Sequence, residues 1–230
     1  MKAFIFPGQG AQYVGMGLEF YKAFDIARKT FDEANNILGF DLTKLCFEDS
    51  SGELRLTANA QPAILTVSVA ALRVLLEETD IKADYVAGHS LGEYTALVAS
   101  GAMEFKDAVL IVRKRGEYMQ TAVPLGLGSM SAIIGLQKEE VETICNKVSS
   151  NGSIVSAANF NAPGQTVISG NKDAVDKASA MAKYLGAKRV IPLEVSAPFH
   201  SSLMTPAAEN LSKDLEKINF SGLKLPVVTN

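Results

Sequence analysis

The chain has 230 residues, of which 47% are hydrophobic and 20% are charged, and its formal net charge is −3. This balance is typical of a globular protein with a sizeable core and excludes a disordered chain or a collagen-like repeat. The net charge excludes a strongly basic protein of the kind that binds nucleic acid. The longest apolar stretch, residues 63–76, contains Thr66 and Ser68 and is broken by Arg73, so we expect it to be too short and too polar to span a bilayer.

Two cysteines occur, Cys46 and Cys145, and neither belongs to a CxxC spacing. The sequence therefore indicates neither a disulfide framework nor a zinc site, and we expect a reduced, cytoplasmic setting. The N-terminal segment MKAFIFPGQG has one charge and a proline after a short apolar run, which predicts a strand and a turn rather than a signal peptide.

The first half of the chain alternates strands, glycine turns and helices. The predicted elements, in chain order, are a strand at 2–6, helices at 25–38 and 62–78, a strand at 85–87, and helices at 91–100 and 105–122. Asp25 caps its helix and Gly39 ends it, Pro62 opens the next helix, and Gly101 closes the helix at 91–100. This alternation predicts the α/β class, with a parallel sheet covered by helices.

From residue 126 to residue 195 the order changes to βαββαβ. The predicted strands are 129–134, 154–159, 166–169 and 189–195, with helices at 138–149 and 172–185, and a helix at 203–218 and a strand at 226–230 follow. The βαββαβ order is the split βαβ unit of a ferredoxin-like subdomain. We therefore predict an α/β-hydrolase-like body, residues 1–125 and 197–230, with a ferredoxin-like subdomain inserted at 126–196.

The segment Gly88-His-Ser-Leu-Gly92 is a GxSxG between a predicted strand and a predicted helix. Its glycines permit a sharp turn that lifts Ser90 above the sheet, and the helix start directs free N–H groups to the same place. We predict that Ser90 is a nucleophile and that the backbone N–H of Leu91 donates to an oxyanion. The alternative is a glycine turn with a capping serine.

A serine nucleophile needs a base, and the chain contains two histidines. His89 directly precedes Ser90, so its side chain should leave the turn in another direction. His200, just before the last predicted helix, is therefore the predicted base; the alternative is a histidine satisfied at a helix start.

The glycine-rich loop at residues 7–10 matches neither GxGxxG nor a Walker loop, because no Lys-Ser/Thr follows at the right place. We predict that it supplies a second backbone N–H at the site, from Gln9. The alternative is a simple glycine-rich turn.

The helix predicted at 105–122 carries an arginine on its apolar side. At about 100° per residue, Arg115 falls in the middle of the apolar arc, while Arg113 points roughly 160° away. A guanidinium on a buried face keeps its charge and needs an anionic partner. That partner is either a core Asp or Glu, or the carboxylate of a bound substrate.

Several motifs occur in one order: FPGQGAQ, GHSLGEY, Arg115-Gly followed by Met119-Gln120, GSMSAI, Asn161-x-Pro-Gly-Gln165 and PFH. Together they make the whole chain resemble the malonyl-CoA:acyl-carrier-protein transacylases of fatty-acid and polyketide synthesis. The resemblance implies malonyl transfer from malonyl-CoA to the phosphopantetheine thiol of the carrier protein, with no metal or redox cofactor.

The resemblance also implies roles for individual residues. Ser90 would accept the acyl group, with His200 as its base, and Arg115 would bind the malonyl carboxylate. Gln9 and Leu91 would form the oxyanion hole.

Three further residues, Gln61, Met119 and Asn161, match family positions at the substrate pocket. Gln61 could equally be an ordinary polar residue near a helix start.

Two expectations concern specificity and partners. Phe199 either narrows the pocket against a methyl branch on the malonyl group or simply packs. Lys183, Lys188 and Arg189 form a basic surface for an acidic carrier protein, or are ordinary solvated residues. We expect a monomer without nucleic-acid or membrane partners.

The resembled family continues beyond the strand at 227–229, with a residue whose backbone carbonyl orients the catalytic histidine. We expect either a truncated product or a sequence that stops early. Two other functions stay open. A serine esterase or thioesterase also uses GxSxG but has no use for a buried arginine, and an inactive fragment would only bind acyl-CoA or the carrier protein.

Overall fold

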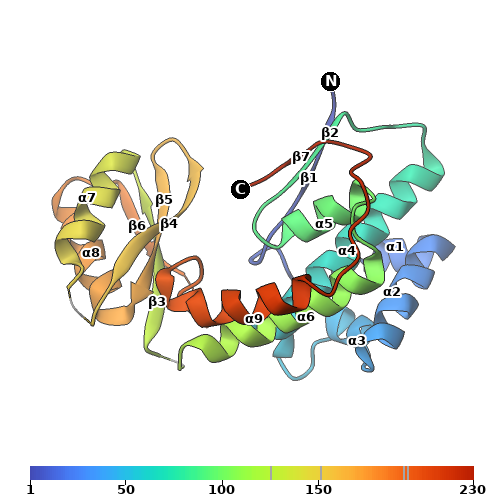
Figure 1. Ribbon diagram of the computed structural model, residues 1–230, viewed down its shortest axis with the longest axis horizontal. Helices are drawn as coiled ribbons and strands as arrows, with labels where there is room; N and C mark the ends of the chain where they lie inside the picture. The colour runs from blue at the N-terminus through green and yellow to red at the C-terminus, as the bar shows by residue number, and fades with distance from the viewer. Residues whose placement is uncertain (125, 151, 194, 196) are drawn as a thin grey trace. The chain divides into compact units, whose positions relative to one another are not determined.

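The computed structural model describes residues 1–230 apart from 125, 151, 194 and 196, and it is a mixed α/β structure (Figure 1). The chain divides into two compact units, a larger one of residues 1–117 and 211–230 and a smaller one of residues 118–210. The division falls inside helices α6 (Phe105–Ala122) and α9 (Thr205–Leu215). The smaller unit thus includes residues 118–125 and 197–210, which the predicted division assigns to the body.

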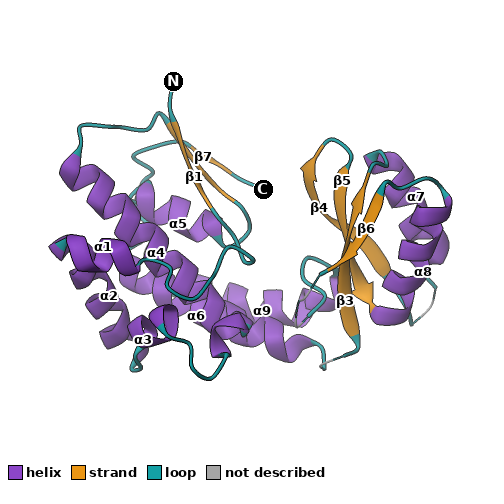
Figure 2. Ribbon diagram, turned by 180° about the vertical axis from the view of Figure 1, so that it is seen from behind, coloured by secondary structure: helices purple, strands orange, loops and turns teal. Residues whose placement is uncertain are grey.

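A three-stranded parallel sheet lies in the larger unit, as the sequence predicts. Its order is β1-β2-β7, with β1 (Ala3–Phe6), β2 (Tyr85–Gly88) and β7 (Val227–Val228). Helix α5 (Gly92–Ala99) packs on β1 and β2, and α4 (Thr57–Glu78) packs on α5 (Figure 2). Phe6 aligns with Gly88, so the loop after β1 and the turn after β2 leave the sheet at the same edge.

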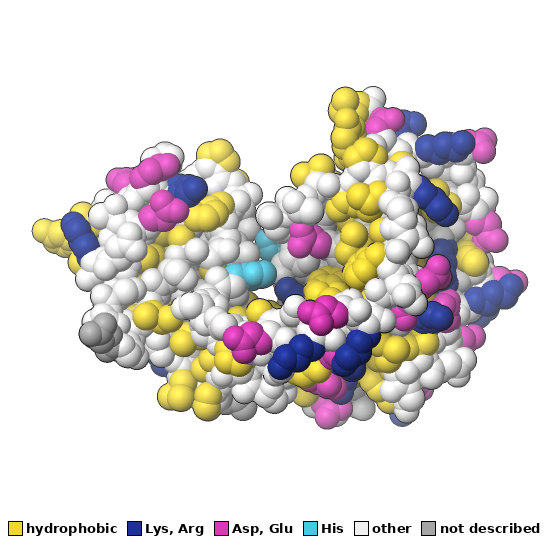
Figure 3. Space-filling model, in the orientation of Figure 1, with side chains coloured by type: hydrophobic (Ala, Val, Ile, Leu, Met, Phe, Trp, Pro, Cys, Tyr) yellow, Lys and Arg dark blue, Asp and Glu magenta, His cyan; other side chains and the backbone are white. Residues whose placement is uncertain are grey.

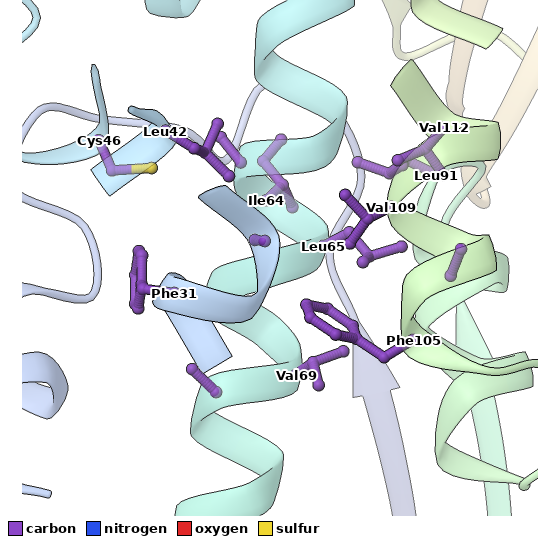
Figure 4. Close-up of a cluster of buried hydrophobic side chains, with 14 of the residues drawn as sticks. Phe31, Leu42, Cys46, Ile64, Leu65, Val69, Leu91, Phe105, Val109 and Val112 are labelled. Carbon is purple, nitrogen blue, oxygen red and sulfur yellow. The ribbon is translucent and has the colours of Figure 1, made fainter. Parts of the chain in front are cut away.

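The core of the larger unit forms around α4, which lies between α2 (Asp25–Leu38) and α6. Figure 4 shows the side chains of these helices pointing toward one another. Phe31, Leu65, Val109 and Leu91 are fully buried in this core. Because Leu91 belongs to the GxSxG segment, the core anchors the turn that carries Ser90.

Two short helices, α1 (Leu18–Ala23) and α3 (Leu42–Phe47), and the 3-10 turn η1 (Glu53–Arg55) lie outside the predicted elements. Helix α2 has the predicted bounds and ends at Gly39, whose φ of 72° is the left-handed C-cap conformation. Asp25 is not its cap, because Phe24 takes the N-cap position and Asp25 pairs with Arg28 instead.

The prediction that Pro62 opens a helix is wrong, because α4 begins at Thr57 and Pro62 lies inside it. Proline lacks the N–H that would bond to the carbonyl of residue i−4, here Ala58. Arg113 replaces it: its Nη1 donates to the Ala58 oxygen at 3.1 Å. A contact from α6 therefore satisfies the carbonyl that the proline leaves free.

The described part of the chain has one helix, α4, that is long and apolar enough to cross a membrane by length and composition. The expectation that this segment is too short and too polar is therefore wrong, since the helix extends over 22 residues. Of its most apolar window, 67% is buried inside the protein, as in a core helix.

The smaller unit contains a four-stranded antiparallel sheet in the order β4-β5-β3-β6. Its elements follow the predicted βαββαβ order: β3 (Gly128–Ile134), α7 (Lys138–Val148), β4 (Val155–Ala162), β5 (Gln165–Asn171), α8 (Lys172–Tyr184) and β6 (Arg189–Pro192). Both helices cover the same face (Figures 1 and 2). The strand predicted at 189–195 ends earlier, at Pro192, and residue 194 lies outside the described residues.

After β6, the 3-10 turn η2 (Ser202–Met204) precedes α9, so the helix predicted at 203–218 is shorter than expected at both ends.

Candidate active site

Ser90 lies in a strained turn between β2 and α5. Its φ is 51°, a left-handed conformation that costs a non-glycine residue on the order of 1–3 kcal/mol. A Cβ on Gly88 would lie 1.9 Å from the backbone carbon of Gly92, and a Cβ on Gly92 would lie 2.3 Å from the carbonyl oxygen of Phe6. Both glycines of the GxSxG are therefore needed for the close backbone contacts of this turn.

The loop after β1 lies directly against the turn. The N–H of His89 donates to the Phe6 oxygen at 3.0 Å, and a Cβ on Gly8 would lie 2.4 Å from the His89 oxygen. Among the described residues, no hydrogen bond uses the backbone N–H of Gln9 or of Leu91. The two N–H groups predicted to face an oxyanion thus have no hydrogen-bond acceptor within the part of the chain that the structure describes.

Arg115 connects α6 to the nucleophile candidate. Its Nη2 donates to the Ser90 Oγ at 3.0 Å and its Nη1 donates to the Gln61 Oε1 at 2.9 Å. The guanidinium carbon lies 5.7 Å from the centre of the Tyr94 ring. Gln61 is fully buried in α4. The structure therefore joins Arg115, Gln61 and Ser90 in one cluster.

The charge of Arg115 is held in a partly desolvated place. Burial lowers the pKa of its guanidinium from the ordinary value, whereas Tyr94 and Glu93 raise it. Burial likewise raises the pKa of the Tyr94 hydroxyl, and Arg115 lowers it. Among the described residues, no carboxylate lies within ion-pair distance of Arg115. The sequence allows either a core Asp or Glu or a substrate carboxylate as the partner of Arg115. The described residues provide no core carboxylate for this role.

The glycine that follows Arg115 explains how the cation reaches this place. A Cβ on Gly116 would lie 2.6 Å from the Cα of Ala58 and 2.7 Å from the Thr57 oxygen. Helices α4 and α6 therefore approach backbone to backbone at this point. Arg113, on the same helix, instead contacts Ala58 and Glu117 and lies over the Phe40 ring.

Sequence reasoning missed one residue at this turn. The Asn230 side chain accepts from the Ser90 N–H at 3.1 Å through Oδ1 and donates to the Gly88 oxygen at 2.6 Å through Nδ2. Its backbone N–H donates to the Glu93 Oε1 at 2.7 Å. No local signal marks it, because its partners lie 137–142 positions away in the chain.

The remaining predicted residues lie in the smaller unit. His200 is exposed and has a φ of 57°. The described non-glycine residues with positive φ are Asp49, Ser90 and His200, so the predicted nucleophile and base are two of three. Phe199 is 6% exposed and packs in a hydrophobic cluster with Met119, and its role in specificity stays a prediction. Asn161 is exposed on β4, next to the turn that joins β4 and β5.

The three predicted carrier-binding side chains are also exposed. Lys183 lies near the end of α8, Arg189 begins β6, and Lys188 precedes it. On the face shown in Figure 3, acidic and basic side chains alternate over the helices of the larger unit rather than gathering by sign.

Neither cysteine is suited to thiolate chemistry. Burial raises the pKa of the Cys46 thiol to about 12 and that of Cys145 to about 11. Both are free and buried. The described residues contain no cluster of three or more His, Cys, Asp or Glu side chains that could hold a metal ion.

The site combines a serine on a strand–turn–helix elbow, an adjacent arginine, and the backbone N–H groups of Gln9 and Leu91, for which the described residues offer no acceptor. This combination is suited to acyl transfer. Residues 3–229 match the family model described as acyl transferase domain, which is the class that this fold and site define.

The relatives narrow the class. The chain is 53% identical over 228 residues to the malonyl CoA-acyl carrier protein transacylase of Bacillus subtilis, covering 99% of this chain and 72% of that protein. It is 50% identical to the one of Salmonella typhimurium, 74% of which it covers. The chain belongs to the malonyl CoA-acyl carrier protein transacylase family.

Solved structures agree. The malonyl CoA-acyl carrier protein transacylase of Coxiella burnetii matches with a TM-score of 0.96 at 46% identity, covering 98% of this chain and 71% of that one. A malonyl-transacylase in complex with a type II polyketide acyl-carrier protein matches with a TM-score of 0.96 at 47% identity, covering 99% of this chain and 74% of that one.

Proposed function

We propose that the protein transfers a malonyl group from malonyl-CoA to the phosphopantetheine thiol of an acyl carrier protein, in fatty-acid or polyketide synthesis. Family membership supports this reaction. The observation that carries it is the 3.0 Å contact between the Arg115 Nη2 and the Ser90 Oγ. One carbon separates the thioester carbonyl of a malonyl group from its free carboxylate, so a cation beside the nucleophile suits this acyl group.

In the first half-reaction, the Ser90 Oγ attacks the thioester carbonyl while His200 takes the hydroxyl proton. The carbon–sulfur bond of the tetrahedral intermediate then breaks. Coenzyme A leaves with the proton from His200, and a malonyl ester remains on Ser90. In the second half-reaction the carrier thiol gives its proton to His200 and attacks the ester, and Ser90 recovers its proton as it leaves.

Gln9 and Leu91 stabilise the oxyanion of the tetrahedral intermediate. Their backbone N–H groups have no other acceptor among the described residues, so neither must break a hydrogen bond in order to donate. A preorganised donor of this kind contributes on the order of 3 kcal/mol to an acyl-transfer barrier.

Arg115 leaves the Ser90 Oγ when the substrate arrives and binds its carboxylate, and Gln61 keeps the guanidinium in place through its Oε1. Phe199 disfavours a methyl branch, and Met119 and Asn161 belong to the pocket. These assignments rest on the resemblance of the surrounding motifs.

The carrier protein docks through Lys183, Lys188 and Arg189, which are exposed and of one sign, as an acidic partner requires. The reaction requires no metal or redox cofactor. The protein acts in the cytoplasm as a monomer, without a membrane or nucleic-acid partner.

We also propose a finer fold class for each of the two units. The strand order β4-β5-β3-β6 together with the βαββαβ sequence supports a ferredoxin-like subdomain at 126–196. The parallel order β1-β2-β7 with α5 after the serine turn supports an α/β-hydrolase-like body.

The test is a transfer assay with malonyl-CoA and a holo-acyl carrier protein, in which malonyl carrier and free malonate are both measured. We expect malonyl carrier to form in large excess over malonate, and Ser90→Ala to abolish it. Malonate as the main product would indicate a thioesterase. Neither product from the wild-type protein would overturn the proposal.

A further inference from the structure

The Asn230 carboxamide contacts both sides of the serine turn. It accepts from the Ser90 N–H at 3.1 Å and donates to the Gly88 oxygen at 2.6 Å. The first contact uses the carbonyl oxygen of the carboxamide as an acceptor, and the second uses its NH2 group as a donor. The backbone N–H of Asn230 donates to the Glu93 Oε1 at 2.7 Å, so the first turn of α5 fixes Asn230 in place.

The sheet topology explains why a residue so distant in sequence reaches the turn. Strand β7 runs parallel to β2, with Val227 opposite Val86 and Val228 opposite Ala87. Parallel neighbours end at the same edge of a sheet, so the residues after β7 lie beside the turn after β2. Asn230 is the second residue after β7, and Ser90 is the second after β2.

These contacts act on a strained part of the backbone. Ser90 has a φ of 51°, a conformation that the surrounding structure must enforce on a residue with a side chain. The Asn230 side chain ties the amide of Ser90 to the carbonyl of Gly88, so the turn cannot relax without breaking both hydrogen bonds.

We propose that Asn230 is a positioning residue for the acyl transfer, one whose carboxamide holds Ser90 in the left-handed conformation and thereby aims its Oγ and the Leu91 N–H. This inference rests on the proposed function, because it assigns the nucleophile to Ser90. Asn230 itself does not contact the reacting atoms. Its effect is on the rate of acylation rather than on the binding of malonyl-CoA.

The variants separate the acceptor oxygen of the carboxamide from its donor NH2 group. Asn230→Ala removes both hydrogen bonds, whereas Asn230→Asp keeps an acceptor for the Ser90 N–H but loses the donor to Gly88. Thr229→Ala is the matched control, since Thr229 is the exposed neighbour on the same segment.

The experiment measures kcat and KM for malonyl-CoA, labelling of Ser90 by a fluorophosphonate probe, and the melting temperature of each variant. For Asn230→Ala we expect kcat to fall about tenfold or more, the value for loss of roughly 1.5 kcal/mol of hydrogen bonding, with KM changed by less than about twofold. Probe labelling slows in parallel. Asn230→Asp falls between Asn230→Ala and the wild type, and Thr229→Ala matches the wild type.

An unchanged kcat in Asn230→Ala would overturn the inference, as would a loss that appears only at temperatures where the variant unfolds. The probe separates this failure from failure of the proposed function. If wild-type Ser90 reacts with the probe but not with malonyl-CoA, the proposed function is wrong. If Asn230→Ala then labels as fast as the wild type, the positioning role is wrong as well.

Discussion

Removal of the Arg115 guanidinium should change which acyl groups the protein accepts. Arg115 donates to Gln61 through Nη1 and to Ser90 through Nη2, so both nitrogens point into the cluster around the nucleophile. A hydrogen bond to a charged group contributes about 1.5–3 kcal/mol. Arg115 is half-buried, so we use the lower value for each of two hydrogen bonds to the malonyl carboxylate, which gives about 3 kcal/mol.

This free energy corresponds to about a 100-fold loss of kcat/KM for malonyl-CoA in Arg115→Ala. Acetyl-CoA has no free carboxylate, so its kcat/KM should change by less than about threefold, as for an interaction that the ligand does not make. Arg115→Lys keeps the charge but not the two-pronged geometry, and we expect about a tenfold loss. The assay is acyl transfer to the carrier protein with each donor.

Arg113→Ala is the matched control on the same helix. Arg113 donates to the Ala58 oxygen and to Glu117, so its loss should lower the melting temperature but leave the ratio of malonyl to acetyl transfer unchanged. A ratio that stays the same in Arg115→Ala, or that falls equally in Arg113→Ala, would refute the carboxylate role.

Three further predictions concern packing, specificity and the thiols. Gly92→Ala should lower the free energy of unfolding in urea by about 3 kcal/mol, because its Cβ would lie 2.3 Å from the Phe6 oxygen. Gly222→Ala should have little effect, since no atom of the described residues lies within 4 Å of its Cβ, and equal effects of the two substitutions would contradict this. Phe199→Ser should raise the methylmalonyl/malonyl rate ratio and lower the melting temperature, and an unchanged ratio would leave Phe199 with packing alone. Cys46, with a pKa of about 12, stays protonated below that pH, so iodoacetamide at pH 8 should modify it only after denaturation, as intact mass measures; rapid modification of the folded protein would be the contrary result.

Local patterns were sufficient where the interactions are local. Helix α2 has its predicted bounds because its apolar period and Gly39 both lie within one segment. The inward side of Arg115 follows from helix geometry alone, and the structure places its guanidinium between Gln61 and Ser90. The start of helix α3 is predictable from the sequence, because Asp41 is a typical N-cap residue and its side chain accepts from the Lys44 N–H.

Features that depend on distant contacts could not be predicted in this way. The sequence predicts Pro62 at a helix start, since the donor that replaces its missing N–H at the Ala58 oxygen belongs to Arg113 on another helix. Helix α1 has no buried residue and therefore no apolar period to detect. The role of Asn230 depends on the pairing of β7 with β2, which only the folded sheet shows.

The most direct test of the central claim is to locate the acyl group after brief incubation with malonyl-CoA and no carrier protein. Tandem mass spectrometry of the digested protein should find one malonyl group, on Ser90, which is absent from Ser90→Ala and is discharged when holo-carrier is added. A malonyl group on any other residue, or none on Ser90 while transfer proceeds, would contradict the account.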